Sequence, residues 1–521
     1  MPELHVRLSE TTKDSSVNWQ ILRVGIPKMN PKKAQKPVRA DWHLTVENLG
    51  PLNHAEVHIK PLTVFIGPNS SGKSYLAVAI DSICCLMDFE TIFKRRTISR
   101  GLKKNQDYKR GTRKFLLGKT TEGRKQIGEF LLSALSSIAK DKEEIFQNEL
   151  KKCLIDALED LTYSIESSFS DTIENLITSG HDFIDIEVKV ETVETRIRIS
   201  PTKTEYIKIN MGSITFPEAS EDTPDDVLEM LQILEKFATI LEDSSVGPSM
   251  LYRLFVDGTI KSARYPSYRE IWFLPAARGS YLQTYHTVTS SLYSGVPDAL
   301  LRRTKLQVPK YPSYAISLFE NLRSLPTEIG SLSELADDLE RNGLDGHVQV
   351  RVKPTIDVPE IIFVENGRIT PWQRVSSGVS ELAPLVLYVR HYIEPGDLLI
   401  FEEPEAHLHP RLVIEVVKLL VGLVNRKVNV LVTTHSQFFL SALNNHIRAS
   451  KLKKKQRDGI GIESLKPDSV SAYLFKPCDE SNYFCSEFIP IDDEGIGERE
   501  FVNIHKHLYE SASMIDYRTS E

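Results

Sequence analysis

The chain has 521 residues, of which 41% are hydrophobic and 26% are charged, and its formal net charge is −7. This length allows more than one domain with a core that needs no covalent support, and the composition is typical of a globular protein. No stretch of about 18 apolar residues occurs, and the first residues carry no apolar signal core, which argues against a membrane span and a secretion signal. We therefore expect no membrane partner.

The cysteines are odd in number and form no C-x-x-C pair. They are Cys84, Cys85, Cys153, Cys478 and Cys485. This pattern argues against a disulfide framework and against a structural zinc site. A reduced, cytoplasmic location is the simplest expectation.

The N-terminal region consists of a polar leader and a group of predicted strands. Residues 1–40 are rich in lysine and proline and read as the leader. Strands are predicted at 44–49, 55–60 and 61–66, and the last of these is apolar throughout. A helix with an apolar body is predicted from Ser74 onwards.

A glycine-rich loop joins the third strand to this helix. Residues 67–74 read GPNSSGKS and match G-x-x-x-x-G-K-[ST], the P-loop pattern, in which backbone N–H groups and the helix N-terminus bind phosphate oxygens. Lys73 is expected to reach the β- and γ-phosphates of ATP, and the Ser74 hydroxyl to ligate Mg²⁺. The predicted nucleotide-binding residues are Gly67, Pro68, Asn69, Ser70, Ser71, Gly72, Lys73 and Ser74.

A long segment, 91–270, follows the N-terminal lobe of residues 41–90. Residues 94–114 carry ten Lys or Arg and one Asp, helical spacing follows at 126–176, and alternating apolar residues at 183–216 predict a small β meander. A further helix fits 224–242. We interpret 91–270 as a helical and β insertion that precedes the remainder of the domain, 271–510, and a tail, 511–521.

Two features stand out in the first part of that remainder. A hairpin is predicted at 360–370, with Asn366 and Gly367 as a type I′ turn. The run VSSGVSELAPL at 375–385 then places Ser376, Ser377 and Gly378 at the N-terminus of a predicted helix. Hydroxyl and N–H groups at such a position can bind an anion, although the same residues also suit an ordinary helix cap.

The apolar strand GDLLIF is followed by FEEPEAHLHP at 401–410. P-loop ATPases need one carboxylate at the end of such a strand to hold Mg²⁺, and many need a second to orient and deprotonate the attacking water. Glu402 fits the first role, where Asp is usual, and Glu403 fits the second. Zinc binding by His407 and His409 is the weaker alternative, because they stand two residues apart with no cysteine near them.

The last motif is the strand LVTTHS at 431–436, which ends at His435. A second basic run, KLKKKQR, covers 451–457. Over the whole region strands alternate with helices, which indicates an α/β fold with a mainly parallel sheet.

Taken in order, FIGPNSSGKS, VSSGVSELAPL, LLIFEEPEAHLHP and LVTTHS resemble the AAA-type members of the ABC ATPase superfamily, relatives of the RecF, SMC and OLD-nuclease ATPase domains. FLPAAR, which ends at Arg278, is similar to a recurrent element of this group. The resemblance covers about 41–90 and 270–510 of the chain. It implies a P-loop NTPase fold of the ABC-ATPase head type.

The resemblance also implies a mechanism. Glu403 and His435 become the expected catalytic residues, with His435 contacting the γ-phosphate. Such heads dimerise head to tail around two ATP molecules, so that Ser376–Gly378, as the signature, meet the γ-phosphate bound to Lys73 of another copy. The expected state is a homodimer or a larger homo-oligomer that hydrolysis opens. The family's Q-loop glutamine cannot be placed.

Two functions are compatible with such a head. Stand-alone heads resemble the ATP-binding partners of nucleases and toxins in Septu-, retron- and PARIS-like systems, which implies a switch or sensor in prokaryotic antiphage defence that controls an effector. The alternative is a RecF- or SMC-like ATPase of DNA repair or chromosome maintenance, which would bind DNA through 94–114 and 451–457. For each basic run, a solvated loop is the other interpretation.

Three other functions are disfavoured. A transporter ATPase would carry its signature much closer to the P-loop, and an SMC-like arm would need a heptad run, which is absent. The phrase DDEGIGEREFV at 492–502 resembles the acidic start of a Toprim nuclease domain. Too few residues follow it for that fold, so no intrinsic nuclease activity is expected.

Overall fold

The computed structural model describes residues 42–87, 161–190, 193–210, 268–284, 311–353, 356–478, 482–498, 506 and 509–515. The leader 1–40, the basic segment 94–114, the helix predicted at 224–242 and most of the helical segment 126–176 lie outside the described residues. Predictions for them stay predictions, as do the domain boundaries.

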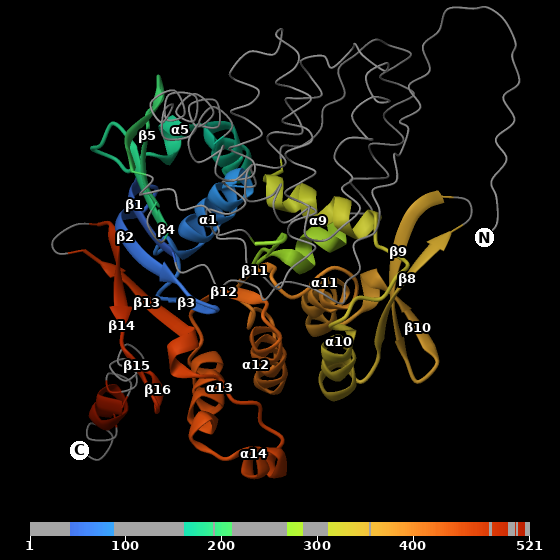
Figure 1. The fold of residues 1–521 in the computed structure, drawn as a ribbon. Helices are drawn as coiled ribbons and strands as arrows, with labels where there is room; N and C mark the ends of the chain where they lie inside the picture. The colour runs from blue at the N-terminus through green and yellow to red at the C-terminus, as the bar shows by residue number, and fades with distance from the viewer. Residues whose placement is uncertain are drawn as a thin grey trace, which may run out of the picture. The chain divides into compact units, whose positions relative to one another are not determined.

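A sheet of eleven strands organises the described part of the chain, in the order β6-β5-β4-β1-β2-β14-β13-β3-β12-β11-β7 (Figure 1). The strands are β1 (Trp42–Leu49), β2 (Leu52–Ile59), β3 (Leu62–Ile66), β4 (Ile184–Val190), β5 (Val193–Ile199), β6 (Thr204–Asn210), β7 (Ile271–Leu274), β11 (Leu398–Glu402), β12 (Asn429–Thr434), β13 (Val470–Pro477) and β14 (Phe484–Ile489). Strands β13, β3, β12, β11 and β7 are parallel neighbours, and this half carries the predicted motifs. The α/β fold class with its parallel sheet is confirmed there, while β6, β5, β4, β1 and β2 pair antiparallel.

The central strands are apolar because helices cover both of their faces. In β3, Leu62, Val64 and Ile66 belong to a core shared with α11 (Ser377–His391), α12 (Pro410–Asn425) and α13 (Gln437–Arg448). Phe65, which points the opposite way, belongs to a second core shared with α1 (Lys73–Met87). Further helices are α5 (Ile173–Leu176), α9 (Ser313–Arg323), α10 (Ser333–Leu339) and α14 (Lys454–Ile460). Short turns are the π-helical η4 (Glu340–Leu344) and the 3₁₀ turns η5 (Trp372–Arg374), η6 (Ala449–Lys451) and η7 (Pro467–Ser469). Helical residues also occur at 161–169, 278–284 and 509–515.

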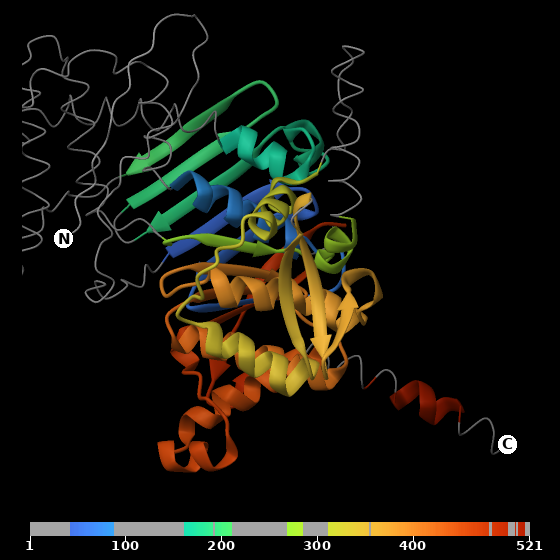
Figure 2. The same cartoon turned by 90° about the vertical axis from the view of Figure 1, so that its right-hand side faces the viewer.

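The alternating residues of 183–216 form β4, β5 and β6, three antiparallel strands. They do not stand alone, because β4 pairs with β1 and places Ile186 opposite Val46. Figure 2 shows these green strands continuing the sheet beyond the blue strand β1. The meander is therefore part of the sheet that also holds the phosphate loop.

A separate sheet of three strands contains β8 (His347–Lys353), β9 (Ile356–Glu365) and β10 (Arg368–Pro371). The turn between β9 and β10 has positive φ at Asn366 (48°) and Gly367 (78°), as a type I′ turn requires. The predicted hairpin is confirmed. A further pair of two-residue strands, β15 (Ile491–Asp492) and β16 (Gly495–Ile496), lies near the end of the described region.

The cysteine pattern predicts no disulfide, and this is wrong for one pair. Cys478 and Cys485 form a disulfide with Cα atoms 5.4 Å apart. They meet because β13 and β14 are antiparallel neighbours, with Lys476 opposite Cys485. None of the described helices is long and apolar enough to span a membrane.

Candidate nucleotide site

The phosphate loop has a backbone shape that only glycine permits at two places. Gly67 and Gly72 have φ of 153° and 90°. A Cβ on Gly67 would lie 2.5 Å from the carbonyl oxygen of Phe475, and one on Gly72 would lie 2.4 Å from a methyl carbon of Leu52. The loop is thus a wrapped backbone packed against β13 and β2, which suits the binding of phosphate oxygens.

Lys73 lies at the start of α1 with a buried side chain. Its ammonium donates to the carbonyl oxygens of Gly67 (2.8 Å) and Pro68 (2.7 Å) and lies 3.4 Å from Ser71 Oγ. Burial lowers the pKa of Lys73, and three nearby glutamates, first of all Glu403, oppose that shift. The cation is held inside the loop, at the place where the P-loop pattern requires it.

Glu402 is the last residue of β11, and β12 lies between this strand and β3. The buried carboxylate accepts a hydrogen bond from the backbone N–H of Ala276 (3.3 Å) and is hydrogen-bonded to the Ser74 hydroxyl. Burial raises its pKa, and the bond to Ser74 opposes this. Its Oε1 has no hydrogen-bond partner among the described residues. A hydroxyl beside a carboxylate with a spare buried oxygen is a donor set that fits Mg²⁺.

Glu403 follows directly, with a left-handed backbone (φ 41°), which is unusual for a residue other than glycine. Its N–H donates to the carbonyl of Thr433 on β12 (2.9 Å). Its carboxylate oxygen lies 3.5 Å from Nδ1 of His435, and the two side chains are 28% and 43% exposed. Both therefore remain open to a ligand or water at the carboxyl edge of the sheet.

The structure adds a third carboxylate, Glu405, whose role the sequence pattern does not indicate. One oxygen of this buried side chain accepts the Thr434 hydroxyl (2.6 Å) and the backbone N–H of His435 (3.0 Å), and it lies 3.8 Å from His435 Nδ1. The other oxygen has no partner among the described residues. The acidic run FEEPE indicates that carboxylates gather at the end of this strand, but their spacing alone does not show which of them turn inward.

The signature residues lie elsewhere in the fold. Ser376 is the N-cap of α11, where its hydroxyl accepts the N–H of Val379 (3.4 Å), and a Cβ on Gly378 would lie 3.0 Å from Leu412 of α12. Within the described ranges, no hydrogen bond or ion pair joins Ser376, Ser377 or Gly378 to the phosphate loop. The structure thus brings together the phosphate loop, Glu402, Glu403 and His435, and leaves the signature outside this group.

The described structure does not favour the zinc alternative. His409 is the N-cap of α12 and accepts the N–H of Arg411 (3.2 Å), while His407 has a left-handed backbone. Within the described ranges, neither histidine belongs to a group of three or more His, Cys, Asp and Glu side chains of the kind that a zinc ion needs. The two histidines shape the turn that leads into the helix.

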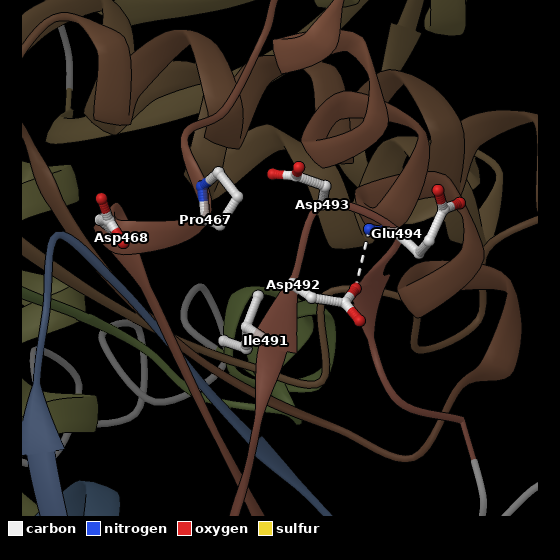
Figure 3. A pocket seen from close by; sticks show the side chains of 6 residues that line it. All are labelled: Pro467, Asp468, Ile491, Asp492, Asp493 and Glu494. Atoms are coloured by element: carbon white, nitrogen blue, oxygen red, sulfur yellow. Dashed lines mark hydrogen bonds between the residues drawn. The ribbon is translucent and has the colours of Figure 1, made fainter.

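A hollow of about 450 Å³ lies away from these residues (Figure 3). It is lined by Pro467, Asp468, Ile491, Asp492, Asp493 and Glu494. Figure 3 shows the Glu494 N–H bonded to the Asp492 carboxylate (2.8 Å), and the Glu494 carboxylate pairs with Lys451 and Arg448. The second basic run therefore begins beside an acidic loop, which neutralises part of its charge.

Comparison with known proteins gives a family match over most of the chain. Residues 43–440 match the family model of the AAA ATPase domain. A search among curated proteins gives no match.

Among solved structures the chain is similar to SMC heads. One, bound to the C-winged helix domain of ScpA, is 11% identical with a TM-score of 0.38, covering 86% of this chain and 97% of its own. A Pyrococcus furiosus SMC head bound to the C-terminal domain of ScpA is 10% identical with a TM-score of 0.35, covering 90% and 98%. An SMC head from Thermotoga maritima is 11% identical with a TM-score of 0.31, covering 87% and 100%.

Proposed function

The chain belongs to the family of the AAA ATPase domain, and from this premise we propose that it binds and hydrolyses ATP with Mg²⁺ and uses the nucleotide to control its own assembly. One observation carries the proposal: Lys73, Ser74, Glu402, Glu403 and His435 come from three separate segments and meet at one edge of the parallel sheet.

Each of these residues has a chemical task that its position suits. Backbone N–H groups of residues 67–74 and the Lys73 ammonium would bind the phosphates, and Ser74 and Glu402 would hold Mg²⁺. Bound MgATP supplies the phosphoryl bond that water cleaves. Glu403, partly exposed and aimed at His435, would orient that water and accept its proton, while His435 would meet the terminal phosphate.

The signature residues would complete the site from a second copy. Ser376 caps α11 and leaves the first N–H groups of this helix available to an anion, yet within one chain these groups lie apart from the phosphate loop. A head-to-tail homodimer would place them against the phosphates bound to the partner. ATP would then be part of the interface, and hydrolysis would open it.

Within this frame we propose that the protein is a cytoplasmic switch or sensor of a prokaryotic antiphage system and controls a nuclease or toxin. Support comes from the sequence resemblance to stand-alone ATPase subunits of such systems. The alternative is a DNA-repair or chromosome-maintenance ATPase that grips DNA when closed. An adjacent nuclease or toxin gene would favour the first, and ATP-dependent, salt-sensitive binding of a DNA duplex would favour the second.

The first test is the mass of the protein in solution with and without MgATP, for wild type and Glu403→Gln. The amide keeps the shape of Glu403 but cannot accept the proton, so the variant should bind ATP, hydrolyse it at least about 100-fold more slowly, and shift to a dimer or larger complex. The exposed Glu334→Gln serves as the control and should behave as wild type. Normal hydrolysis by Glu403→Gln together with a nucleotide-independent mass would contradict the proposal.

A further inference from the structure

A single buried arginine connects the two halves of the proposed composite site. Arg278 follows β7 and is fully buried. Its Nη1 donates to the carbonyl oxygens of Glu402 (3.0 Å) and Glu403 (3.3 Å), and its Nε donates to the carbonyl oxygen of Glu381 (2.9 Å). The guanidinium also lies over the ring of Phe401, at 4.6 Å from its centre. One planar side chain therefore bonds both the catalytic carboxylate segment and the signature helix.

Side-chain contacts also join Arg278 to the signature helix. Glu381 lies on α11, one turn beyond Gly378, and its carboxylate is 3.5 Å from Nε of Arg278. The N–H of Gly279 hydrogen-bonds the Glu381 carboxylate, and a Cβ at Gly279 would lie 2.4 Å from one of its oxygens. The chain after Arg278 therefore packs directly on α11, and a methyl group at position 279 would displace the Glu381 carboxylate.

One internal hydrogen bond is missing near the start of α11. Pro384 lies inside α11 and has no N–H, so the carbonyl of Ser380 receives no helical hydrogen bond from that position. Contacts from outside the helix therefore contribute to the position of Ser377–Ala383. Leu412 of α12 packs at Gly378, and Arg278 and Gly279 contact Glu381 one turn further on.

On the catalytic side, Arg278 bonds a segment whose backbone is strained. Glu403 has a left-handed φ of 41°, and a non-glycine residue stays in that region only where surrounding contacts hold it. Arg278 donates hydrogen bonds to the carbonyl oxygens of Glu402 and Glu403, which belong to the peptide groups on either side of the Glu403 Cα atom. The N–H of Glu403 donates to the carbonyl oxygen of Thr433. This backbone directs the Glu403 carboxylate toward His435.

The connection also retains unused hydrogen-bonding capacity. Nη2 of Arg278 and Oε2 of Glu381 are both buried and have no hydrogen-bond partner among the described residues, although Oε2 forms the 3.5 Å ion pair with Nε of Arg278. Because Nη2 is a spare donor on the same guanidinium, Oε2 can pair with it in place of Nε when α11 shifts.

We propose that Arg278 is a positioning residue that sets the Glu403 backbone according to the position of the signature helix α11. The proposal rests on the proposed function, since it assumes that the signature meets a nucleotide on a second copy. When the signature engages that nucleotide, α11 moves with Glu381, and Arg278 transmits the movement to Glu402 and Glu403. Hydrolysis is thereby favoured in the closed assembly.

The test compares Arg278→Lys, Arg278→Met and Gly279→Ala in the full chain. Lysine keeps a cation but has one nitrogen where Arg278 uses two, Nε toward Glu381 and Nη1 toward Glu402 and Glu403. Methionine removes all donors, and alanine at position 279 pushes the Glu381 carboxylate away while Arg278 stays. Because Lys73 and Ser74 are untouched, binding of a fluorescent ATP analogue should stay within about threefold of wild type, whereas kcat should fall about 10- to 100-fold. In the Glu403→Gln background each change should also abolish ATP-driven assembly at a protein concentration where the parent assembles.

The matched control is Arg390→Lys. Arg390 is a partly buried arginine at the other end of α11, paired with Glu340, so it reports what general loss of helix stability does. It should lower the melting temperature and leave kcat and assembly close to wild type. If Arg390→Lys lowers kcat as much as the Arg278 and Gly279 variants, or if a folded Gly279→Ala keeps wild-type kcat and assembly, the proposal is overturned. Failure of the Glu403→Gln parent itself to assemble would instead reject the proposed function.

Discussion

At the residue scale, the candidate site depends on the hydrogen-bond partners of its buried carboxylates. Glu402 is held by Ala276 and by the Ser74 hydroxyl, and Glu405 by Thr434 and the backbone of His435. Each keeps one oxygen without a partner among the described residues. The first of these oxygens suits a metal ion, and the second carboxylate fixes the turn that presents His435.

The role of Glu405 can be tested by two substitutions. Glu405→Ala removes the acceptor of both the Thr434 hydroxyl and the His435 N–H, so His435 should lose its position and kcat should fall about tenfold or more with little change in KM. Glu405→Gln keeps one acceptor oxygen and should retain most of the activity. Steady-state ATPase kinetics measure both. Equal losses in the two variants would show that the negative charge of Glu405 matters more than its hydrogen bonds.

Asp397 lies in the turn before β11 and gives the fold a dependence on pH. Its fully buried carboxylate accepts the Trp272 indole N–H and the Glu394 N–H at 2.9 Å each, and burial raises its pKa to about 6, against 3.8 in the open chain. The folded state thus holds the proton more tightly than the unfolded state. Protonated Asp397 therefore stabilises the folded state fully below pH 3.8, and this stabilisation is lost as the pH rises through about 6.

Asp397→Asn should therefore stabilise the folded protein most, relative to wild type, at neutral pH. The amide is an uncharged group of the same shape, so the melting temperature of the variant relative to wild type should be higher near pH 7.5 than near pH 4.5. The difference between the two conditions should be at most about 3 kcal/mol in unfolding free energy. Melting curves at the two pH values check this, and a difference of opposite sign would contradict the assigned direction of the pKa shift.

At the scale of elements, helices near the site are joined by one buried ion pair. Glu340, at the start of the π-helical turn η4, accepts the N–H of Val348 on β8 (2.7 Å) and pairs with Arg390 in the last turn of α11 (2.8 Å). Glu340 is fully buried, whereas Asp337, a second partner of Arg390, is 51% exposed. Both carboxylates pair with Arg390 and differ in burial. Substituting each in turn therefore shows how burial changes the contribution of an ion pair to stability.

Glu340→Ala should destabilise the protein by about 3–5 kcal/mol, because it leaves Arg390 without its buried partner and the Val348 N–H unpaired. Asp337→Ala removes an exposed partner of the same arginine and should cost less than about 1 kcal/mol. Thermal or urea unfolding measures both changes. Similar costs would mean that Arg390 turns to solvent and that the ion pair does not anchor α11.

At the scale of the whole molecule, the proposed head-to-tail homodimer leads to a prediction about mixed assemblies. Lys73→Ala and Ser376→Arg should each be inactive alone. In a mixture, a heterodimer contains one site with an intact phosphate loop from one copy and an intact signature from the other, so ATPase activity should return above the sum of the two variants. A mixture of Lys73→Ala with Ser74→Ala provides the control, because both changes affect the same half-site and no intact site forms. Absence of recovery in the first mixture would argue that each chain hydrolyses ATP by itself.

Much of this molecule follows from contiguous stretches of sequence. The phosphate loop, the end of β11 at Glu402, the Asn366-Gly367 turn and the N-cap at Ser376 are local features, since a loop, a cap or a turn depends on residues within a few positions of one another. Their order along the chain also indicated the α/β fold, because a parallel sheet requires alternating strands and helices.

Other features depend on contacts between distant segments, and no local pattern contains them. Strand β4 pairs with the edge of β1 because apolar and polar residues alternate in the same way along both strands. Cys478 meets Cys485 because β13 pairs with β14. Glu405 becomes a support for His435, and Arg278 a connection between Glu403 and Glu381, only when three segments pack together. A buried polar group must find its partner wherever the fold places one, so its role is defined by burial and proximity rather than by its neighbours along the chain.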